Sequence, residues 1–321
     1  MKAYIIRRLL IALPLLLAIS FITFLFIQIA PGDYFDTLRL NPQISEETIK
    51  LYESQYHFNE PVLIQYFWWL KNLLKFDLGY SFTQKNSVVS VIKSRLANTL
   101  ILSLASLIFT WLIAIPLGIY CAVKQYRWPD KIFSGLSFFG LSIPSFFLAI
   151  VLLYLASITG ILPLGGMRSA GFEGLSWAGR ILDILKHLII PTIVVSLAAI
   201  ASLQRIMRAN TLEILRQRYI LTARAKGLPE TRVLYRHVLR NALNPLVTIF
   251  GYHLSDILSG AALTEIICNW PGLGSVMLAA VRSQDMFLVM GTMLIGALLL
   301  ILSNLLADIL LARLDPRIRY E

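Results

Sequence analysis

Residues 98–123 read NTLILSLASLIFTWLIAIPLGIYCAV, and no charged side chain interrupts them between Arg95 and Lys124. As a helix rising about 1.5 Å per residue, this run can cross the roughly 30 Å hydrocarbon core of a bilayer. A soluble core would interleave its apolar residues with polar ones. Of the 321 residues, 57% are hydrophobic and only 15% are charged. The sequence therefore predicts an all-α integral membrane protein.

Five similar apolar runs lie on either side of this stretch. The first follows Lys2, Arg7 and Arg8, as a signal peptide would, but it is too long and lacks a small-x-small cleavage site. It ends at Ala30-Pro31-Gly32-Asp33, a helix stop, and is interpreted as a retained span. Together with 98–123 the runs predict six transmembrane helices, and they cover residues 9–30, 132–160, 187–204, 244–267 and 287–312.

Basic residues are distributed unevenly among the connections between these runs. The chain has 29 Lys and Arg against 18 Asp and Glu, a net charge of +11. One side of the membrane receives the N-terminus and the basic stretches 124–131, 205–240 and 313–319, and the positive-inside rule makes that side cytoplasmic. Both termini are then cytoplasmic. Because the charges gather between spans and not on one amphipathic face, the bilayer explains them better than nucleic acid does.

This topology divides the chain into four parts. Residues 1–30 form the cytoplasmic N-terminus and first span, 31–97 a long extracytoplasmic segment, 98–312 the transmembrane core with a cytoplasmic loop at 205–243, and 313–321 a cytoplasmic tail.

The extracytoplasmic segment has helical patterns of its own. Ser45 followed by Glu46 and Glu47 is typical of a helix start, and the apolar residues between Leu63 and Leu74 follow the helical period after Pro61. This second helix suits a position at the outer interface or over the outer mouth. Two interpretations remain open: packing against the protein's own spans, or docking of an external partner.

The loop at 205–243 is too polar to span and too long for a simple turn. Residues 208–218 favour a helix, which 219–226 could continue or restart. Gly227 suits the left-handed position after a helix, and Pro229 suits the first position of the next one, which runs to about Asn241. The positive-inside rule accounts for the charge of this loop but not for its layout. A helix, a sharp turn and a second helix indicate a compact knob that another protein could hold.

Within this loop, Thr222-Ala223-Arg224-Ala225-Lys226-Gly227-Leu228 resembles the EAA-loop motif of bacterial ATP-binding cassette (ABC) importer permeases, in the form of the dipeptide, oligopeptide, glutathione and nickel branch and its B-type subunit. Further blocks agree along nearly the whole chain, in order and at family-like spacing. They are Arg7-Arg8-Leu9-Leu10, Ala30-Pro31-Gly32-Asp33, Phe76-Asp77-Leu78-Gly79-Tyr80-Ser81, Leu162-Pro163-Leu164-Gly165-Gly166-Met167, Asn269-Trp270-Pro271-Gly272-Leu273-Gly274 and Leu314-Asp315-Pro316-Arg317-Ile318-Arg319-Tyr320.

The resemblance implies a type I ABC importer permease fold in a bacterial inner membrane. It implies a homologous second permease of the C type, two ABC ATPase subunits and an extracytoplasmic solute-binding protein as partners, with a peptide or similar small polar solute as cargo. ATP and Mg would be bound by the ATPases and no cofactor by this chain. The general motif's Glu falls at Leu221 here, so no argument uses a carboxylate at that position. Arg224 and Lys226 become candidates for polar contacts with the ATPase. The residues assigned to ATPase coupling are Thr222, Ala223, Arg224, Ala225, Lys226, Gly227, Leu228 and Pro229.

The motifs of an enzyme are missing. No G-x-x-x-x-G-K-[ST] phosphate loop, catalytic triad order or metal-spaced cluster occurs in the sequence, so no catalytic or metal-binding residue is assigned. Cys121 and Cys268 have no spacing typical of a metal site or disulfide framework, and on the predicted topology they lie near opposite membrane faces.

The fifth apolar run carries polar residues near its middle. Gly251, Ser255 and Ser259 recur every four residues, a stripe where another helix can approach, and His253 and Asp256 are neighbours on a helix. Ionisable groups at this depth indicate either a translocation pathway or a polar packing contact. They also leave room for a proton-coupled secondary transporter, although inverted repeats are not evident. A membrane scaffold with a basic recruiting loop is a third, weaker alternative.

Overall fold

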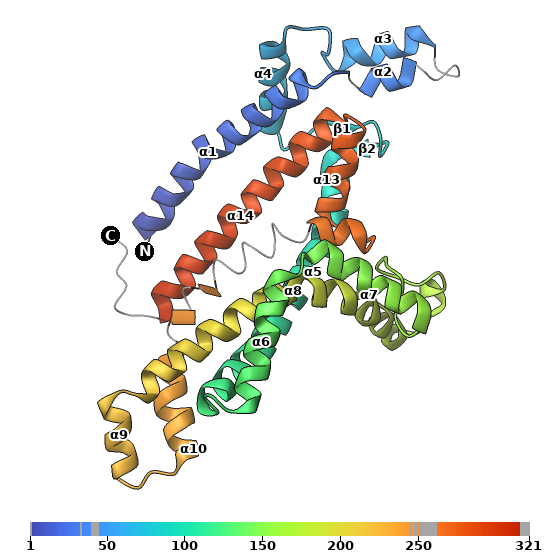
Figure 1. Cartoon of the computed structure of the whole chain (residues 1–321). Helices are drawn as coiled ribbons and strands as arrows, with labels where there is room; N and C mark the ends of the chain where they lie inside the picture. The colour runs from blue at the N-terminus through green and yellow to red at the C-terminus, as the bar shows by residue number, and fades with distance from the viewer. Residues whose placement is uncertain are drawn as a thin grey trace. The chain divides into compact units, whose positions relative to one another are not determined.

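The computed structural model describes residues 2–32, 34–39, 45–243, 245–246, 249–250 and 262–314 of the chain. Most of the described residues are helical (Figure 1). Their only β-sheet is a hairpin of two strands, each two residues long. The chain divides into two compact units, one of Lys2–Thr99 with Pro271–Ile301, the other of Leu100–Trp270 with the chain from Leu302. Two long helices, α5 and α14, run from one unit into the other.

The first unit holds the whole of α1, the segment between α1 and α5, and the starts of α5 and α14. Its two strands pair antiparallel, with Tyr80 opposite Ser87 and Ser81 opposite Asn86. The elements are α1 (Lys2–Ile29), α2 (Tyr34–Arg39), α3 (Glu46–Gln55), α4 (Val62–Leu73), β1 (Tyr80–Ser81), β2 (Asn86–Ser87), the start of α5 (Val88–Val123), α13 (Leu273–Arg282) and the start of α14 (Met286–Leu314).

A buried carboxylate ties the hairpin to α14. Asp285, fully buried before the first turn of α14, accepts hydrogen bonds from the Ser81 and Thr83 hydroxyls, both at 2.7 Å, and from the Thr83 N–H at 3.1 Å. Gly79, at φ +94°, precedes the first strand, and a Cβ there would lie 2.8 Å from the Phe287 ring. Residues some 200 positions apart in sequence are thereby joined.

The helices predicted for residues 31–97 are present. Ser45 caps α3, its hydroxyl accepting the Thr48 N–H at 3.3 Å, as Ser45-Glu46-Glu47 predicted. One face of α4 packs on α1: Tyr66 contacts the Phe21 ring at 5.2 Å between centroids and bonds to the Ser20 hydroxyl at 2.9 Å. The interpretation that this helix packs against the protein's own span is thus confirmed for this face of α4. Phe67 on another face is exposed, and docking there stays a prediction.

The second unit contains the remaining described helices. The 39-residue helix α8 packs against both α6 and α7. In chain order the elements after α5 are α6 (Trp128–Ser142), α7 (Ser145–Thr159), the 3₁₀ turn η1 (Phe172–Gly174), α8 (Trp177–Leu215), α9 (Arg218–Ala225), α10 (Glu230–Arg232), the π-helical turn η2 (Val233–Leu239) and α11 (Arg240–Ala242). Cys121 and Cys268 are both free and buried in this unit.

The long apolar helices confirm an α-helical membrane protein. Among the described residues α1, α5, α8 and α14 are each long and apolar enough to span, and α6 with α7 brings the number to five. The predicted span 132–160 is divided into two helices, since α6 and α7 meet at a bend of 104°. Pro144 has no N–H to donate and restricts Ile143, which is extended at φ −83° and ψ 122°. The predicted span 244–267 lies mostly outside the described residues.

Candidate functional site

The predicted cytoplasmic loop begins inside α8 and not at its end. This helix continues without a break from Trp177 to Leu215, so the first third of 205–243 is a direct extension of an apolar span. Beyond it, α9 and the helical segment 230–242 lie beside one another, joined by a turn at 226–229 (Figure 1). These residues, 218–242, are called the knob below.

The turn of the knob is a Schellman motif. Gly227 has φ +74°, in the left-handed region, and its N–H donates to the Arg224 carbonyl at 2.9 Å. The Leu228 N–H donates to the Ala223 carbonyl at 3.4 Å, which completes the motif. The predicted left-handed helix end at Gly227 is therefore confirmed. Pro229 was predicted as the first helical residue of the next helix, but it is the N-cap of α10, with ψ 141°.

A small apolar core fixes the knob to α8. Ile220, Val233 and Val238 are fully buried, and Ile214 and Leu215 from the end of α8 pack against them. The π-helical turn η2 brings Val233 and Val238, five positions apart, to the same buried side, which a regular helix would not do. The knob and the end of α8 thus share one apolar core.

The Arg224 side chain bridges the two ends of the turn. Its Nε and Nη2 donate to the two carboxylate oxygens of Glu230, at 3.1 and 2.5 Å. These hydrogen bonds raise the pKa of the Arg224 guanidinium above its usual range. Glu230 is the single carboxylate in 218–243, a signal that could have predicted the pair. Arg224, expected to contact a partner, is engaged inside the knob, whereas Lys226 is exposed.

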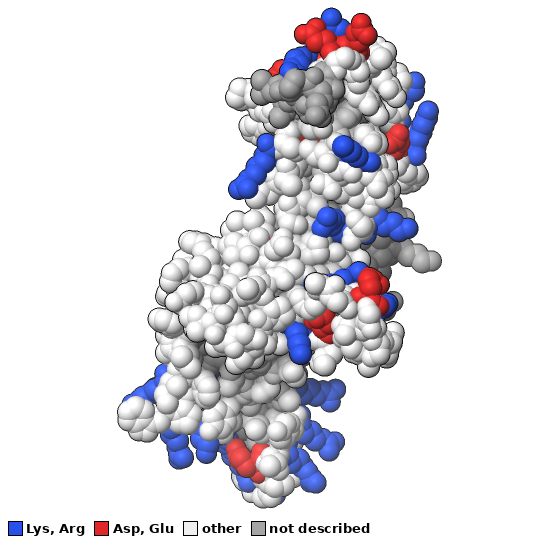
Figure 2. Space-filling view, turned by 90° about the vertical axis from the view of Figure 1, so that its right-hand side faces the viewer, with Lys and Arg blue, Asp and Glu red and all other residues white. Residues whose placement is uncertain are grey.

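The outer surface of the knob mixes cations with apolar side chains. Leu221 is 57% exposed, and Tyr219 and Tyr235 are also exposed. Thr222 and Ala225 are exposed beside them, whereas Ala223 faces the core. In Figure 2, Lys and Arg gather at the end of the molecule where Figure 1 places α9 and α10. Exposed Tyr, Leu and Arg on a small rigid element are typical of a protein-docking surface.

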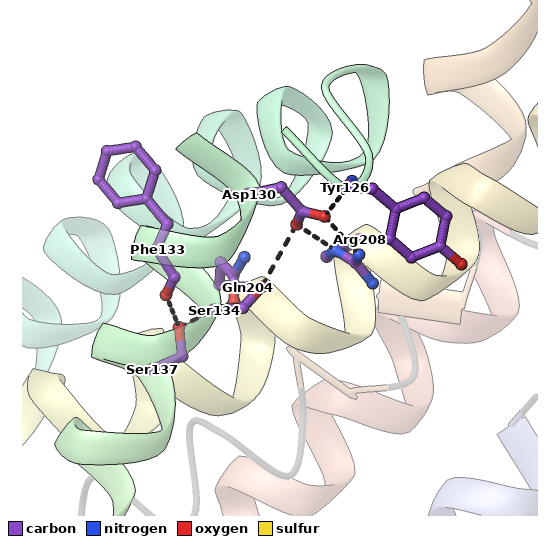
Figure 3. A network of polar contacts seen from close by, with 7 residues as sticks. All are labelled: Tyr126, Asp130, Phe133, Ser134, Ser137, Gln204 and Arg208. Atoms are coloured by element: carbon purple, nitrogen blue, oxygen red, sulfur yellow. Dashed lines mark hydrogen bonds and ion pairs between the residues drawn. The ribbon is translucent and has the colours of Figure 1, made fainter. Parts of the chain in front are cut away.

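A buried ion pair joins α6 to α8 above the knob (Figure 3). Asp130, 3% exposed, accepts from the Arg208 guanidinium at 2.6 and 2.7 Å, from the Tyr126 N–H at 2.9 Å and from the Ser134 hydroxyl at 3.3 Å. Two turns further along α6, the Ser137 hydroxyl donates to Gln204 at 2.9 Å. We call Asp130 and Arg208 the α6–α8 clamp.

The sequence pattern did not predict this clamp. Arg208 was read only as part of a basic stretch, and Asp130 was not singled out. The available signal was local: Asp130 is an acidic residue within the basic connection 124–131, directly after Pro129 at a helix start. Its partner 78 positions away could not be identified from that pattern.

The remaining predicted positions are not tested. Gly251, His253, Ser255, Asp256 and Ser259, proposed for a pathway or packing contact, lie outside the described residues, as does most of the block 314–320. Within the described part of the chain no group of three or more His, Cys, Asp or Glu could hold a metal ion.

Comparison with known proteins covers nearly the whole sequence. The family model of the binding-protein-dependent transport system inner membrane component matches residues 114–320, and the model of its N-terminal part matches residues 1–105. The chain belongs to this family. It is a permease, which is a transport subunit of an ABC importer and not an enzyme. Members of this family are multi-pass proteins of the inner membrane.

The relatives of this permease match it from end to end. The oligopeptide transport system permease protein AppB of Bacillus subtilis is 41% identical over 321 residues, all of both chains. The glutathione transport system permease protein GsiC of Escherichia coli K12 is 33% identical over the same full length. Among solved structures, an inward-facing MetNI methionine ABC transporter is similar with a TM-score of 0.53 and 17% identity, covering 71% of this chain and 97% of that one. That likeness shows the fold.

Proposed function

We propose that this permease forms, with a homologous second permease, the translocation pathway for peptides or similar small polar solutes. An extracytoplasmic solute-binding protein delivers the cargo, and two ATPase subunits drive the cycle through the knob. The observation that carries the proposal is the Schellman turn at Gly227, located in the segment that resembles the EAA loop and packed on the end of α8.

Movement of the knob is transmitted as a rigid-body movement. The apolar core of the knob includes the end of α8, and α8 is one helix of 39 residues. The α6–α8 clamp extends the connection to a second helix. When two ATPases close on ATP, a partner that holds the exposed surface of α9 displaces α8 and α6 together. ATP and Mg are bound by the ATPases, and this chain contributes the mechanical connection.

The names of the relatives support the choice of cargo. The similar proteins are named as oligopeptide, peptide and glutathione permeases. All of these cargoes are short peptides, so a short peptide is the cargo class we infer for this chain. A proton-coupled transporter using His253 and Asp256 is the second candidate, and a scaffold that recruits a cytosolic protein is the third.

Uptake by the purified system distinguishes these alternatives. We expect the isolated permease neither to bind nor to hydrolyse ATP, because it has no phosphate loop. Proteoliposomes that contain the permease with its co-purified second permease and ATPases should accumulate tripeptide only when ATP and the solute-binding protein are both supplied. Uptake driven by a proton gradient without ATPase subunits would support the secondary transporter instead. Stoichiometric ATP binding by the permease alone would contradict the proposal.

Thiol labelling tests the orientation of the knob. In a background with Cys121→Ala and Cys268→Ala, Asn59→Cys in the segment between α3 and α4 should react with a membrane-impermeant maleimide added to intact cells. Thr231→Cys in the knob should react only after the membrane is opened, because the positive-inside rule places 205–240 in the cytoplasm. Both positions are exposed, so access to the thiol does not limit the reaction. The reverse labelling pattern would overturn the proposed coupling role.

A further inference from the structure

A basic, aromatic pocket lies at the turn between α5 and α6. Its volume is about 480 Å³. Among the described residues that line it, three are cations, three are aromatic and none is acidic: Lys124, Arg127, Lys131, Tyr120, Tyr126 and Trp128. The Lys131 ammonium lies 5.8 Å from the centre of the Trp128 ring. A pocket with three positive charges and no carboxylate in its lining selects an anion.

The pocket is held in shape by the α6–α8 clamp. Tyr126 has φ +64°, an unusual conformation for a residue other than glycine, and its N–H is held by Asp130 at 2.9 Å. The Arg127 N–H donates to the Lys124 carbonyl at 3.0 Å. The carboxylate of Asp130 is next to the pocket in sequence, but it is buried and bonded to Arg208, and no ion pair to the three lining cations is present in the described part of the chain.

Two exposed apolar stripes lead into the pocket. On α5, Leu112, Pro116 and Tyr120 recur every four residues and end at Lys124. On α6, the exposed residues Trp128, Ile132 and Leu136 have the same spacing. Residues four apart share one face of a helix, and Tyr120 contacts Phe133 of α6 at 6.5 Å between ring centroids. The exposed apolar faces of these two neighbouring helices thus end at the cationic pocket.

We propose that this pocket binds the phosphate of an anionic phospholipid, whose acyl chains lie along the stripes of α5 and α6. A soluble phosphate would use the same cations, but it would not explain the exposed apolar stripes or the exposed Trp128 and Tyr126, residue types that prefer the membrane interface. The inference does not depend on the cargo or on coupling through the knob.

Lipid titration of the full-length permease in detergent, followed by native mass spectrometry, tests the site. Phosphatidylglycerol should bind at least about tenfold more tightly than phosphatidylcholine. The triple variant Lys124→Gln, Arg127→Gln, Lys131→Gln should lose that preference, because each cation near an anionic headgroup contributes roughly a fivefold factor. The charge-preserving variant Lys124→Arg, Arg127→Lys, Lys131→Arg should keep it, which separates lost binding from lost folding.

A matched control removes the same charge elsewhere. The variant Lys50→Gln, Lys85→Gln, Lys93→Gln changes three exposed lysines of residues 31–97 and should leave the lipid preference intact. Equal loss in both triple variants would show non-specific attraction and overturn the site. Millimolar inorganic phosphate should compete only weakly with the lipid. If phosphate alone saturates the pocket and phosphatidylglycerol binds no tighter, the site belongs to a free anion and the lipid assignment is wrong.

Discussion

Replacing Gly227 with valine should reduce ATP-driven uptake about tenfold while the permease remains in the membrane at normal abundance. Gly227 occupies the left-handed region at φ +74°, and no atom lies within 4 Å of where a Cβ would be. The penalty is therefore one of backbone conformation and not of steric collision. It amounts to roughly 1–2 kcal/mol for an ordinary side chain and more for a β-branched one. A penalty of that size changes the population of the native turn by about 5- to 30-fold.

Transport and ATP hydrolysis should fall together in this variant. A displaced knob breaks the connection between ATPase and span, and thermodynamic coupling between two sites acts in both directions. The measurements are tripeptide uptake and cargo-stimulated ATP hydrolysis by the reconstituted complex, with permease abundance followed by immunoblot. Abundance should hold because the knob core is small compared with the buried surface of the spans.

Two further variants separate turn geometry from side-chain bulk. Gly227→Asn should retain most of the activity, because asparagine tolerates the left-handed region and keeps the N–H that closes the Schellman motif. Gly174→Val places the same side chain in open space at a glycine without positive φ, and it should be neutral. Wild-type uptake by a stably assembled Gly227→Val complex would sink the proposal that this turn couples ATP to movement.

Removing the cation of the α6–α8 clamp should have the largest effect on stability. Arg208→Met leaves the Asp130 carboxylate, which is 3% exposed, without its charged partner. Breaking a buried pair in this way costs about 3–5 kcal/mol. Since 25% of the Arg208 side chain is exposed, solvent screens the pair and we expect the lower end, about 3 kcal/mol. Thermal unfolding of the purified permease measures the loss.

The clamp also predicts an asymmetry between its two partners. Asp130→Asn should cost less than Arg208→Met, because the partly exposed Arg208 can reach water and asparagine can still accept the Tyr126 N–H. The double variant Asp130→Asn, Arg208→Met should recover much of the loss, since no unpaired charge remains. A double variant as unstable as the two single variants added together would contradict the pairing.

Several features followed from the sequence because their causes are local. The apolar runs predicted α1, α5 and α14, since unbroken hydrophobic stretches of that length can satisfy their backbone groups in lipid only as helices. Ser45 and Gly227 were assigned correctly because a cap or a left-handed turn depends on residues a few positions away. The blocks distributed along the chain were sufficient for the family, which the comparisons confirmed.

Other features were decided only by tertiary structure. The single apolar run 132–160 gave no sign of the 104° bend between α6 and α7, two helices that both pack against α8. The pairing of Asp130 with Arg208 joins residues 78 positions apart, and that of Asp285 with Ser81 joins residues 204 apart. A buried carboxylate must find donors wherever the fold places them, and no local pattern records which distant residue supplies them. The sequence alone therefore determined most of the long helices and the left-handed turn at Gly227, whereas packing decided which polar groups hold them together.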